Sequence, residues 1–144
     1  MVRDKEAPVS EPNINRLKNQ LNEHCSVLGV APFIQTCPQH DGSPHVEIKD
    51  GRYHYIITDR GNELAHKITD DEDEIMYWLV SDVVFGMACT YELENRIKGQ
   101  SFRRLLFSKQ IELMKKVNPN WAKRTEKEIE AILEAHPYDD KAEG

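Results

Sequence analysis

The apolar residues near the beginning of the chain recur every three or four positions, which is the spacing of one face of an α-helix. They are Ile14, Leu17, Leu21, Cys25 and Leu28. Asn13 precedes them as a suitable N-cap, and Gly29 follows them as a suitable stop. The pattern predicts an amphipathic helix, preceded by a polar and proline-interrupted flexible tail over residues 1–12.

Between residues 45 and 68 the pattern changes to short β-branched and aromatic runs separated by turn residues. We expect strands at 45–49, 52–58 and 63–68. Asp50-Gly51 indicates a type I′ turn, because both central residues of that turn need a positive φ, and Asp59-Arg60-Gly61 indicates a second turn. The three prolines of residues 32–44 favour an irregular connection before this β-meander.

A long run that is apolar around much of a helical circumference follows, over about residues 70–97. Such a helix belongs at the buried centre of a fold. The segment Thr69-Asp70-Asp71-Glu72 at its beginning predicts a capping box, in which Thr69 and Glu72 bind the free N–H groups of the first turn.

Two more helices are predicted after residue 100. The first begins near Phe102 and ends near Asn118-Pro119, and the second contains Trp121, Ile129, Ile132 and Leu133. Thr125 to Glu128 resembles an internal capping box, and Pro137 would end the last helix. The predicted fold class is α+β, with a small antiparallel β-meander or hairpin packed against a bundle of about four helices.

Composition fits one soluble domain. The chain has 144 residues, of which 39% are hydrophobic and 31% charged, and no apolar run approaches the ~20 residues of a membrane span. The beginning of the chain lacks the apolar core of a secretory signal, so we expect a cytoplasmic protein. We also expect a single domain over residues 13–138 and a flexible tail over 139–144.

Charge is divided unevenly along the chain. Residues 59–74, the acidic segment, hold seven acids and two bases, a net charge of −5. Residues 96–127, the basic segment, hold ten bases and two acids, a net charge of +8. Such polarity can steer association with a charged partner, although runs of charge also occur on ordinary solvated surfaces.

Catalytic and metal-binding patterns are weak or absent. Cys37-Pro38-Gln39-His40 has the gap of a zinc knuckle, and Cys25 and His45 lie near it in sequence, but no second C-x-x-C pair occurs. The odd number of cysteines argues against a disulfide framework. The acids at 70–74 are explained by the helix dipole as well as by a hydrolytic site. We therefore predict no catalytic residue, no metal and no cofactor, and the absence of an aromatic stacking platform argues against nucleic acid.

An ordered set of motifs runs through the chain. It consists of Tyr53–Gly61, Thr69–Trp78, Arg103-Arg104 with Phe107 and Gln110, and Trp121 with residues 128–133. Over about residues 45–138 this set resembles the immunity protein 63 family of bacterial polymorphic toxin systems. The resemblance implies a cytoplasmic protein that binds and neutralises a cognate toxin domain without catalysis, and it supplies no catalytic residues.

Candidate partner-binding residues lie in and beside the acidic segment. They are Tyr53, Tyr55, Asp59, Arg60, Glu63, Asp70, Asp71 and Asp73. Tyrosine and arginine are frequent at interfaces, but Tyr53 and Tyr55 share one face of a strand, and one face of that strand must be core. Pairing between Arg60 and Glu63, and between Arg103-Arg104 and the acidic helix, is the intramolecular alternative.

Two other classes of function remain open from the residues. One is a non-enzymatic adaptor or scaffold domain, and the other is a small hydrolase or nucleic-acid-binding regulator.

Overall fold

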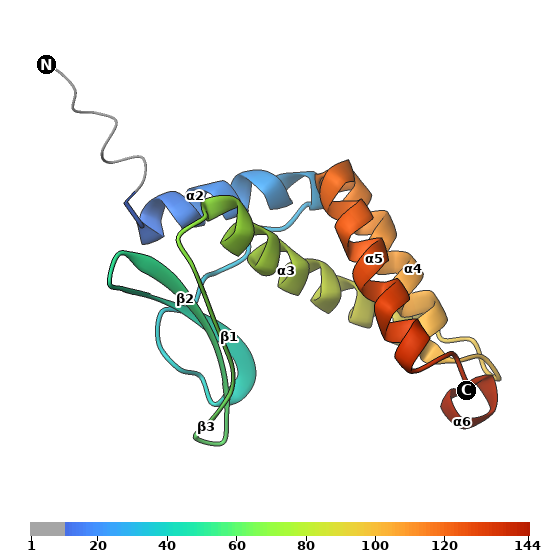
Figure 1. The fold of residues 1–144 in the computed structure, drawn as a ribbon. Coiled ribbons are helices and arrows are strands. Elements are labelled where there is room, and N and C mark those ends of the chain that lie inside the picture. Colours follow the sequence, from blue (N-terminus) through green and yellow to red (C-terminus); the bar gives the residue numbers. More distant parts are fainter. Residues whose placement is uncertain (1–10) are drawn as a thin grey trace, which may run out of the picture. The chain divides into compact units, whose positions relative to one another are not determined.

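The computed structural model describes residues 11–144 (Figure 1). Within them, a three-stranded antiparallel sheet accompanies five α-helices, and 56% of the described residues are helical against 19% in strands. These proportions confirm the predicted α+β class. Residues 1–10, most of the predicted N-terminal tail, lie outside the described residues.

The described residues divide into two compact units. The first contains residues 11–23 and Ala31–Trp78, and the second contains His24–Val30 and Leu79–Gly144. The boundaries fall inside two helices, so each of these helices contributes residues to both units. The expectation of a single domain over 13–138 stays a prediction.

The first helix has the predicted cap and stop. α2 spans Ile14–Cys25 and continues into the 3-10 turn η1, Ser26–Leu28. The Arg16 N–H donates to Asn13 Oδ1 at 2.9 Å, so Asn13 satisfies one of the free N–H groups of the first turn. Gly29 ends the segment in the left-handed region, with φ of 77°.

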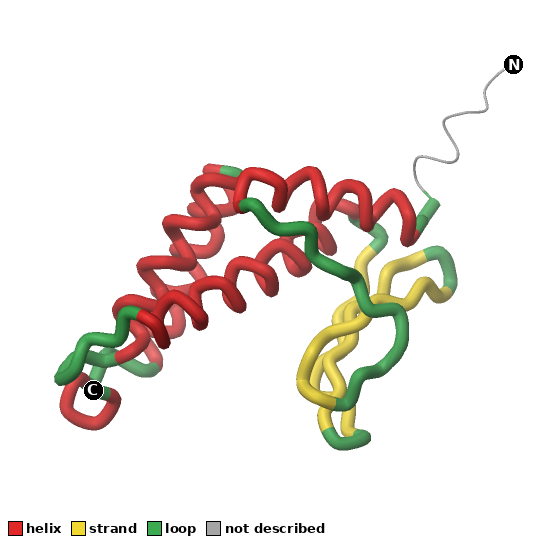
Figure 2. Tube along the Cα trace, turned by 180° about the vertical axis from the view of Figure 1, so that it is seen from behind, coloured by secondary structure: helices red, strands yellow, loops and turns green. Residues whose placement is uncertain are grey.

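The sheet is the predicted meander, with β1 (Asp41–Lys49), β2 (Arg52–Asp59) and β3 (Asn62–Thr69) in that order. The strands lie side by side in Figure 2. β1 begins earlier than expected, because residues 41–44 pair with the end of β2 across an irregularity in the register. Pro44 is accommodated there because an edge strand does not need every N–H for pairing.

Both tight turns of the sheet have two consecutive residues with positive φ. The values are 53° and 70° at Asp50 and Gly51, and 53° and 82° at Arg60 and Gly61. These are the requirements of type I′ turns, whose twist matches that of the flanking strands. The prediction of both turns is confirmed.

β2 is buried on both of its faces, although the sequence predicts one core face. Tyr53 and Tyr55 point to one face and His54 and Ile56 to the other, and all four are buried. β2 is the central strand, and the irregular segment before β1 contributes to its cover, since the His40 N–H donates to a β2 side chain, Thr58 Oγ1, at 3.2 Å.

The cap of α3 (Glu72–Glu94) differs from the prediction. The Asp73 N–H donates to Asp71 Oδ1 at 2.9 Å, so Asp71 is the N-cap. Thr69 instead accepts a hydrogen bond from the Asp71 N–H. The predicted Thr69–Glu72 capping box is therefore wrong, because the chain had two competing cap residues two positions apart.

The second unit contains an antiparallel helix pair, α4 (Phe102–Val117) and α5 (Pro119–Ala135), which lie side by side in Figures 1 and 2. Asn118 caps α5, and Pro119 occupies its first turn, where the missing N–H costs nothing. α5 is continuous, and Thr125 is buried within it, so the predicted internal capping box is wrong.

A small core holds this unit together. Ala88 of α3, Leu106 and Phe107 of α4, and Ile129 of α5 form one buried apolar cluster. Tyr138 packs against that cluster from beyond the end of α5. The core therefore joins three helices and the segment that follows them.

Candidate partner-binding surface

The two candidate tyrosines lie in the core of the first unit. Tyr53 is fully buried and Tyr55 is 3% exposed. The Tyr53 hydroxyl accepts from the Asn13 N–H at 3.0 Å and donates to Glu72 Oε2 at 3.1 Å. The ring of Tyr55 lies 5.7 Å from the ring of Trp78. Of the two roles left open from the sequence, both rings occupy the structural one.

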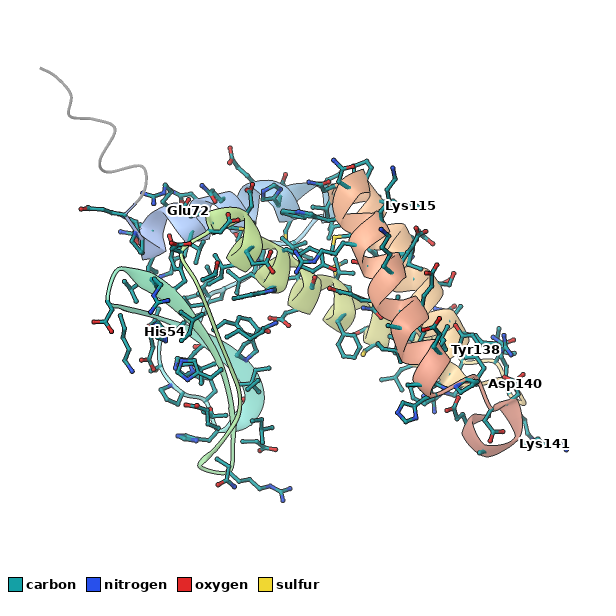
Figure 3. All side chains as sticks on the ribbon, in the orientation of Figure 1. His54, Glu72, Lys115, Tyr138, Asp140 and Lys141 are labelled. Carbon is teal, nitrogen blue, oxygen red and sulfur yellow. The ribbon has the colours of Figure 1, made fainter. Side chains whose placement is uncertain are left out.

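Glu72 connects three elements of the first unit (Figure 3). Its carboxylate accepts hydrogen bonds from the guanidinium of Arg16 at 3.0 Å, from Gln20 Nε2 at 3.2 Å and from the Tyr53 hydroxyl. The Arg16 guanidinium holds the pKa of Glu72 below its usual value, and burial raises the pKa of Tyr53. This network joins α2, β2 and the beginning of α3.

β3 is an exposed edge strand. Six of its eight residues are exposed, and it pairs with β2 alone among the described strands. Leu64 is the additional residue of a bulge and is 62% exposed. Lys67 Nζ lies 4.4 Å from the centre of the Trp78 ring and 4.8 Å from that of Tyr55, so its charge stacks on the aromatic pair. This edge can accept another strand or a flat protein surface.

At the β2–β3 turn, Glu63 pairs with His66 instead of Arg60. His66 Nδ1 lies 3.0 Å from Glu63 Oε1, and His66 Nε2 lies 2.8 Å from His54 Nδ1. A hydrogen bond between two imidazoles needs one N–H and one lone pair, so one ring donates and the other accepts. The three side chains therefore form a chain from the exposed turn to the buried face of β2.

The remaining acidic candidates form two groups, one at each end of β3. Asp59 belongs with Arg60 and Glu63 at the β2–β3 turn, and Asp70, Asp71 and Asp73 surround the beginning of α3. β3 runs from one group to the other, and its eight residues, of which Glu63 is the second, span about 25 Å at the rise of an extended strand. All of these residues except the half-buried Asp59 are exposed. The structure therefore does not bring the two groups together.

The cysteine and histidine residues weighed as zinc ligands lie in different environments. Cys25 is buried, and that burial raises the pKa of its thiol to about 11. Cys37 is exposed, and His40 Nδ1 accepts from the Gly61 N–H at 3.2 Å. His45 is buried and lies 2.7 Å from Glu47. Across residues 11–144, no group of three or more His, Cys, Asp or Glu residues is arranged to hold a metal ion.

Arg103 and Arg104 pair within the molecule, as the alternative proposed, but their partners are in α6 (Asp140–Glu143). Arg103 lies 2.9 Å from Glu143, and Arg104 lies 3.0 Å from Asp140. Arg103 also donates to the carbonyl oxygens of His136 and Pro137. The sequence predicts a flexible tail at 139–144, whereas the structure places a one-turn helix there, because its acids meet these two arginines.

Sequence reasoning missed the chain of Glu63, His66 and His54. One signal for it was present: Glu63 and His66 both lie in the predicted strand that follows the strand carrying His54. The pairing of Ile56 with His66 brings the two histidines together, and that register required the bulge at Leu64. Pattern analysis of each strand alone does not supply this register.

The chain belongs to the immunity protein 63 family, whose profile matches residues 49–131, more than half of its length. The match covers the β2–β3 hairpin and the whole of α3 and α4. No match was found among curated proteins or among solved structures. None of the helices in the described part of the chain combines the length and apolar character needed to cross a membrane.

Proposed function

We propose that this chain is a cytoplasmic immunity protein that binds the cognate toxin domain of a bacterial polymorphic toxin system and neutralises it by protein–protein contact, without a reaction of its own. Membership of the immunity protein 63 family carries this proposal. Inhibition of this kind requires a stable surface complementary to the toxin in shape and charge, and no catalytic group.

We further propose that the toxin meets the first unit along β3. The exposed charges of Arg60 and Glu63 and the half-buried Asp59 lie at one end of this strand, and the exposed charges of Asp70, Asp71 and Asp73 lie at the other. A standard interface buries about 800 Å² on each partner, which suits a strand about 25 Å long with charged groups at both ends. Tyr53 and Tyr55 support this surface from within the core and do not contact the partner.

The central test is co-expression with the toxin domain encoded by the adjacent gene. The immunity protein should restore growth, and it should co-purify in a defined ratio with a catalytically inactive form of that toxin. Using the inactive toxin separates binding from rescue. A toxin domain from an unrelated locus is the matched control, and it should neither co-purify nor be neutralised. Absence of both rescue and co-purification with the cognate toxin would reject the proposal.

A further inference from the structure

Half of the bases in the basic segment are neutralised within the molecule. Those with an ion-pair partner are Arg96, Arg103, Arg104, Lys109 and Arg124. The other five, Lys98, Lys115, Lys116, Lys123 and Lys127, make no ion pair with any described residue. Three of these five, Lys115, Lys116 and Lys123, lie where α4 ends and α5 begins, the end of the helix pair at which Figure 3 labels Lys115, and Lys127 lies halfway along α5. The positive charge of the second unit is therefore concentrated there.

An apolar pocket opens beside this basic end. It has a volume of about 410 Å³ and lies between α3, α4 and η1. Its apolar wall comes from Val27, Leu28, Met87, Tyr91 and Leu113. Val27 is apolar, yet its side chain is 56% exposed to solvent. A pocket of this size and lining accepts a bulky apolar side chain from another molecule.

Two lysines and one acid form the rim of the pocket. Lys109 Nζ stacks 4.3 Å from the centre of the Tyr91 ring and pairs with Glu112 at 3.0 Å, so its position is fixed. Lys116 lines the same side, is exposed, and makes no ion pair. Glu94 lies on the α3 side of the rim. An incoming carboxylate is therefore attracted on the α4 side and repelled on the α3 side, which gives the occupant one orientation.

We propose that this pocket is a second docking site for the toxin domain, whose occupant is an acidic segment that inserts one bulky apolar side chain and places its carboxylates beside Lys116 and Lys115. The inference rests on the proposed function. It adds a contact that has the opposite sign of charge to the acidic groups of the first unit. A bulky side chain that fills a well-packed pocket is the usual form of an energetic centre at an interface, and complementary charge at the rim fixes its orientation.

The test measures the affinity of the catalytically inactive toxin domain for two pocket variants and two matched controls. The pocket variants are Val27→Asp, which places a negative charge in the apolar wall, and Lys116→Glu, which reverses the rim charge. The controls are Leu93→Asp, an exposed apolar residue on α3 outside the pocket, and Lys98→Glu, an unpaired lysine before α4. Thermal melts verify that each variant is folded.

Both pocket variants should weaken binding by about tenfold or more, whereas both controls should stay within about twofold of the wild type. The effect of Lys116→Glu should be smaller at high salt, because exposed charges are screened. Wild-type affinity in either pocket variant would overturn the docking site and leave the proposed function intact. Failure of the wild-type protein to bind the toxin would instead reject the proposed function, and the docking site with it.

Discussion

Glu72 shows how one side chain acquires a role that its local sequence does not indicate. The sequence predicts it as the acid of a capping box, but its carboxylate binds Arg16, which lies 56 residues earlier, together with Tyr53. A pattern within four residues identifies a helix beginning, but it cannot specify a partner from another element. The same limit applies to β2. The alternation of its residues places Tyr53 and His54 on opposite faces, but it does not show that both faces are buried.

The Glu72 network makes stability depend on pH. At pH 7 we expect Glu72→Gln to lower the free energy of unfolding by about 1 kcal/mol, a modest value because solvent screens part of the ion pair. The pKa of Glu72 is lowered from 4.5 in the folded state, so the unfolded chain binds its proton first as pH falls. This contribution to stability is complete above pH 4.5 and is lost as pH falls through the lower, folded-state pKa.

Urea unfolding of the wild type and Glu72→Gln between pH 7 and pH 3 measures this dependence. The difference between the two proteins should be constant down to about pH 5 and should shrink below it. Tyr53→Phe removes a hydrogen bond from the same carboxylate without changing charge, so it is the matched comparison. A difference between wild type and Glu72→Gln that persists unchanged at pH 3 would contradict the assignment of the network.

At the scale of elements, the two kinds of glycine in this chain should respond oppositely to alanine. Gly51 has φ of 70° in the β1–β2 turn, whereas Gly86 lies inside α3 without a positive φ. An added Cβ would meet nothing within 4 Å at either position, so only the backbone differs. Gly51→Ala should destabilise by about 1 kcal/mol, and Gly86→Ala should stabilise by about 0.4 to 1 kcal/mol. Thermal or urea unfolding of the two variants measures both signs, and a stabilising Gly51→Ala would contradict the turn type.

α6 gives a second comparison between elements, because its two arginine partners differ in burial. The side chain of Arg103 is 12% exposed and also binds two carbonyl oxygens, whereas that of Arg104 is 43% exposed and pairs with Asp140. Removing a well-packed, multiply bonded arginine leaves several acceptors without a donor. Arg103→Ala should therefore lower the melting temperature more than Arg104→Ala. Protection of the backbone amides of residues 139–144 from hydrogen exchange should also decrease more in Arg103→Ala than in Arg104→Ala. Equal effects of the two substitutions would contradict the larger role of Arg103 in holding α6.

These elements show what the sequence could predict. Turns, α2 with its cap, and the fold class depend on residues close together in the chain, and the structure confirms them. The early start of β1 depends on pairing between Asp41 and Asp59, and α6 depends on arginines 36 and 40 residues away. Of the candidate site, sequence placed the exposed charges correctly at a turn and a helix beginning, but it could not show that β3 separates them. The sequence also gave no sign of the pocket beside Lys116, because residues of three separate elements line that pocket.

At the scale of the whole molecule, the distribution of charge should govern the rate constant for association with the toxin. The acids Asp70, Asp71 and Asp73 are exposed at the beginning of α3, and Asp71 also caps that helix. Replacing all three by asparagine removes charge while keeping a side chain that caps a helix well. Each favourable charge near a helix N-terminus contributes about 0.3 to 1 kcal/mol, so the fold should be disturbed only modestly.

If these acids steer a basic part of the toxin, the triple variant should associate several-fold more slowly at low salt and at nearly the wild-type rate at high salt, because the Debye length falls from about 30 Å at 0.01 M to about 3 Å at 1 M. Stopped-flow association rates across a salt series, with thermal melts of the same proteins, separate steering from folding. Lys98→Glu, which changes charge away from both proposed contacts, controls for net charge. Identical rates for the triple variant and the wild type at every salt concentration would assign these acids to helix capping and dipole stabilisation alone, and would place the toxin contact elsewhere on the molecule.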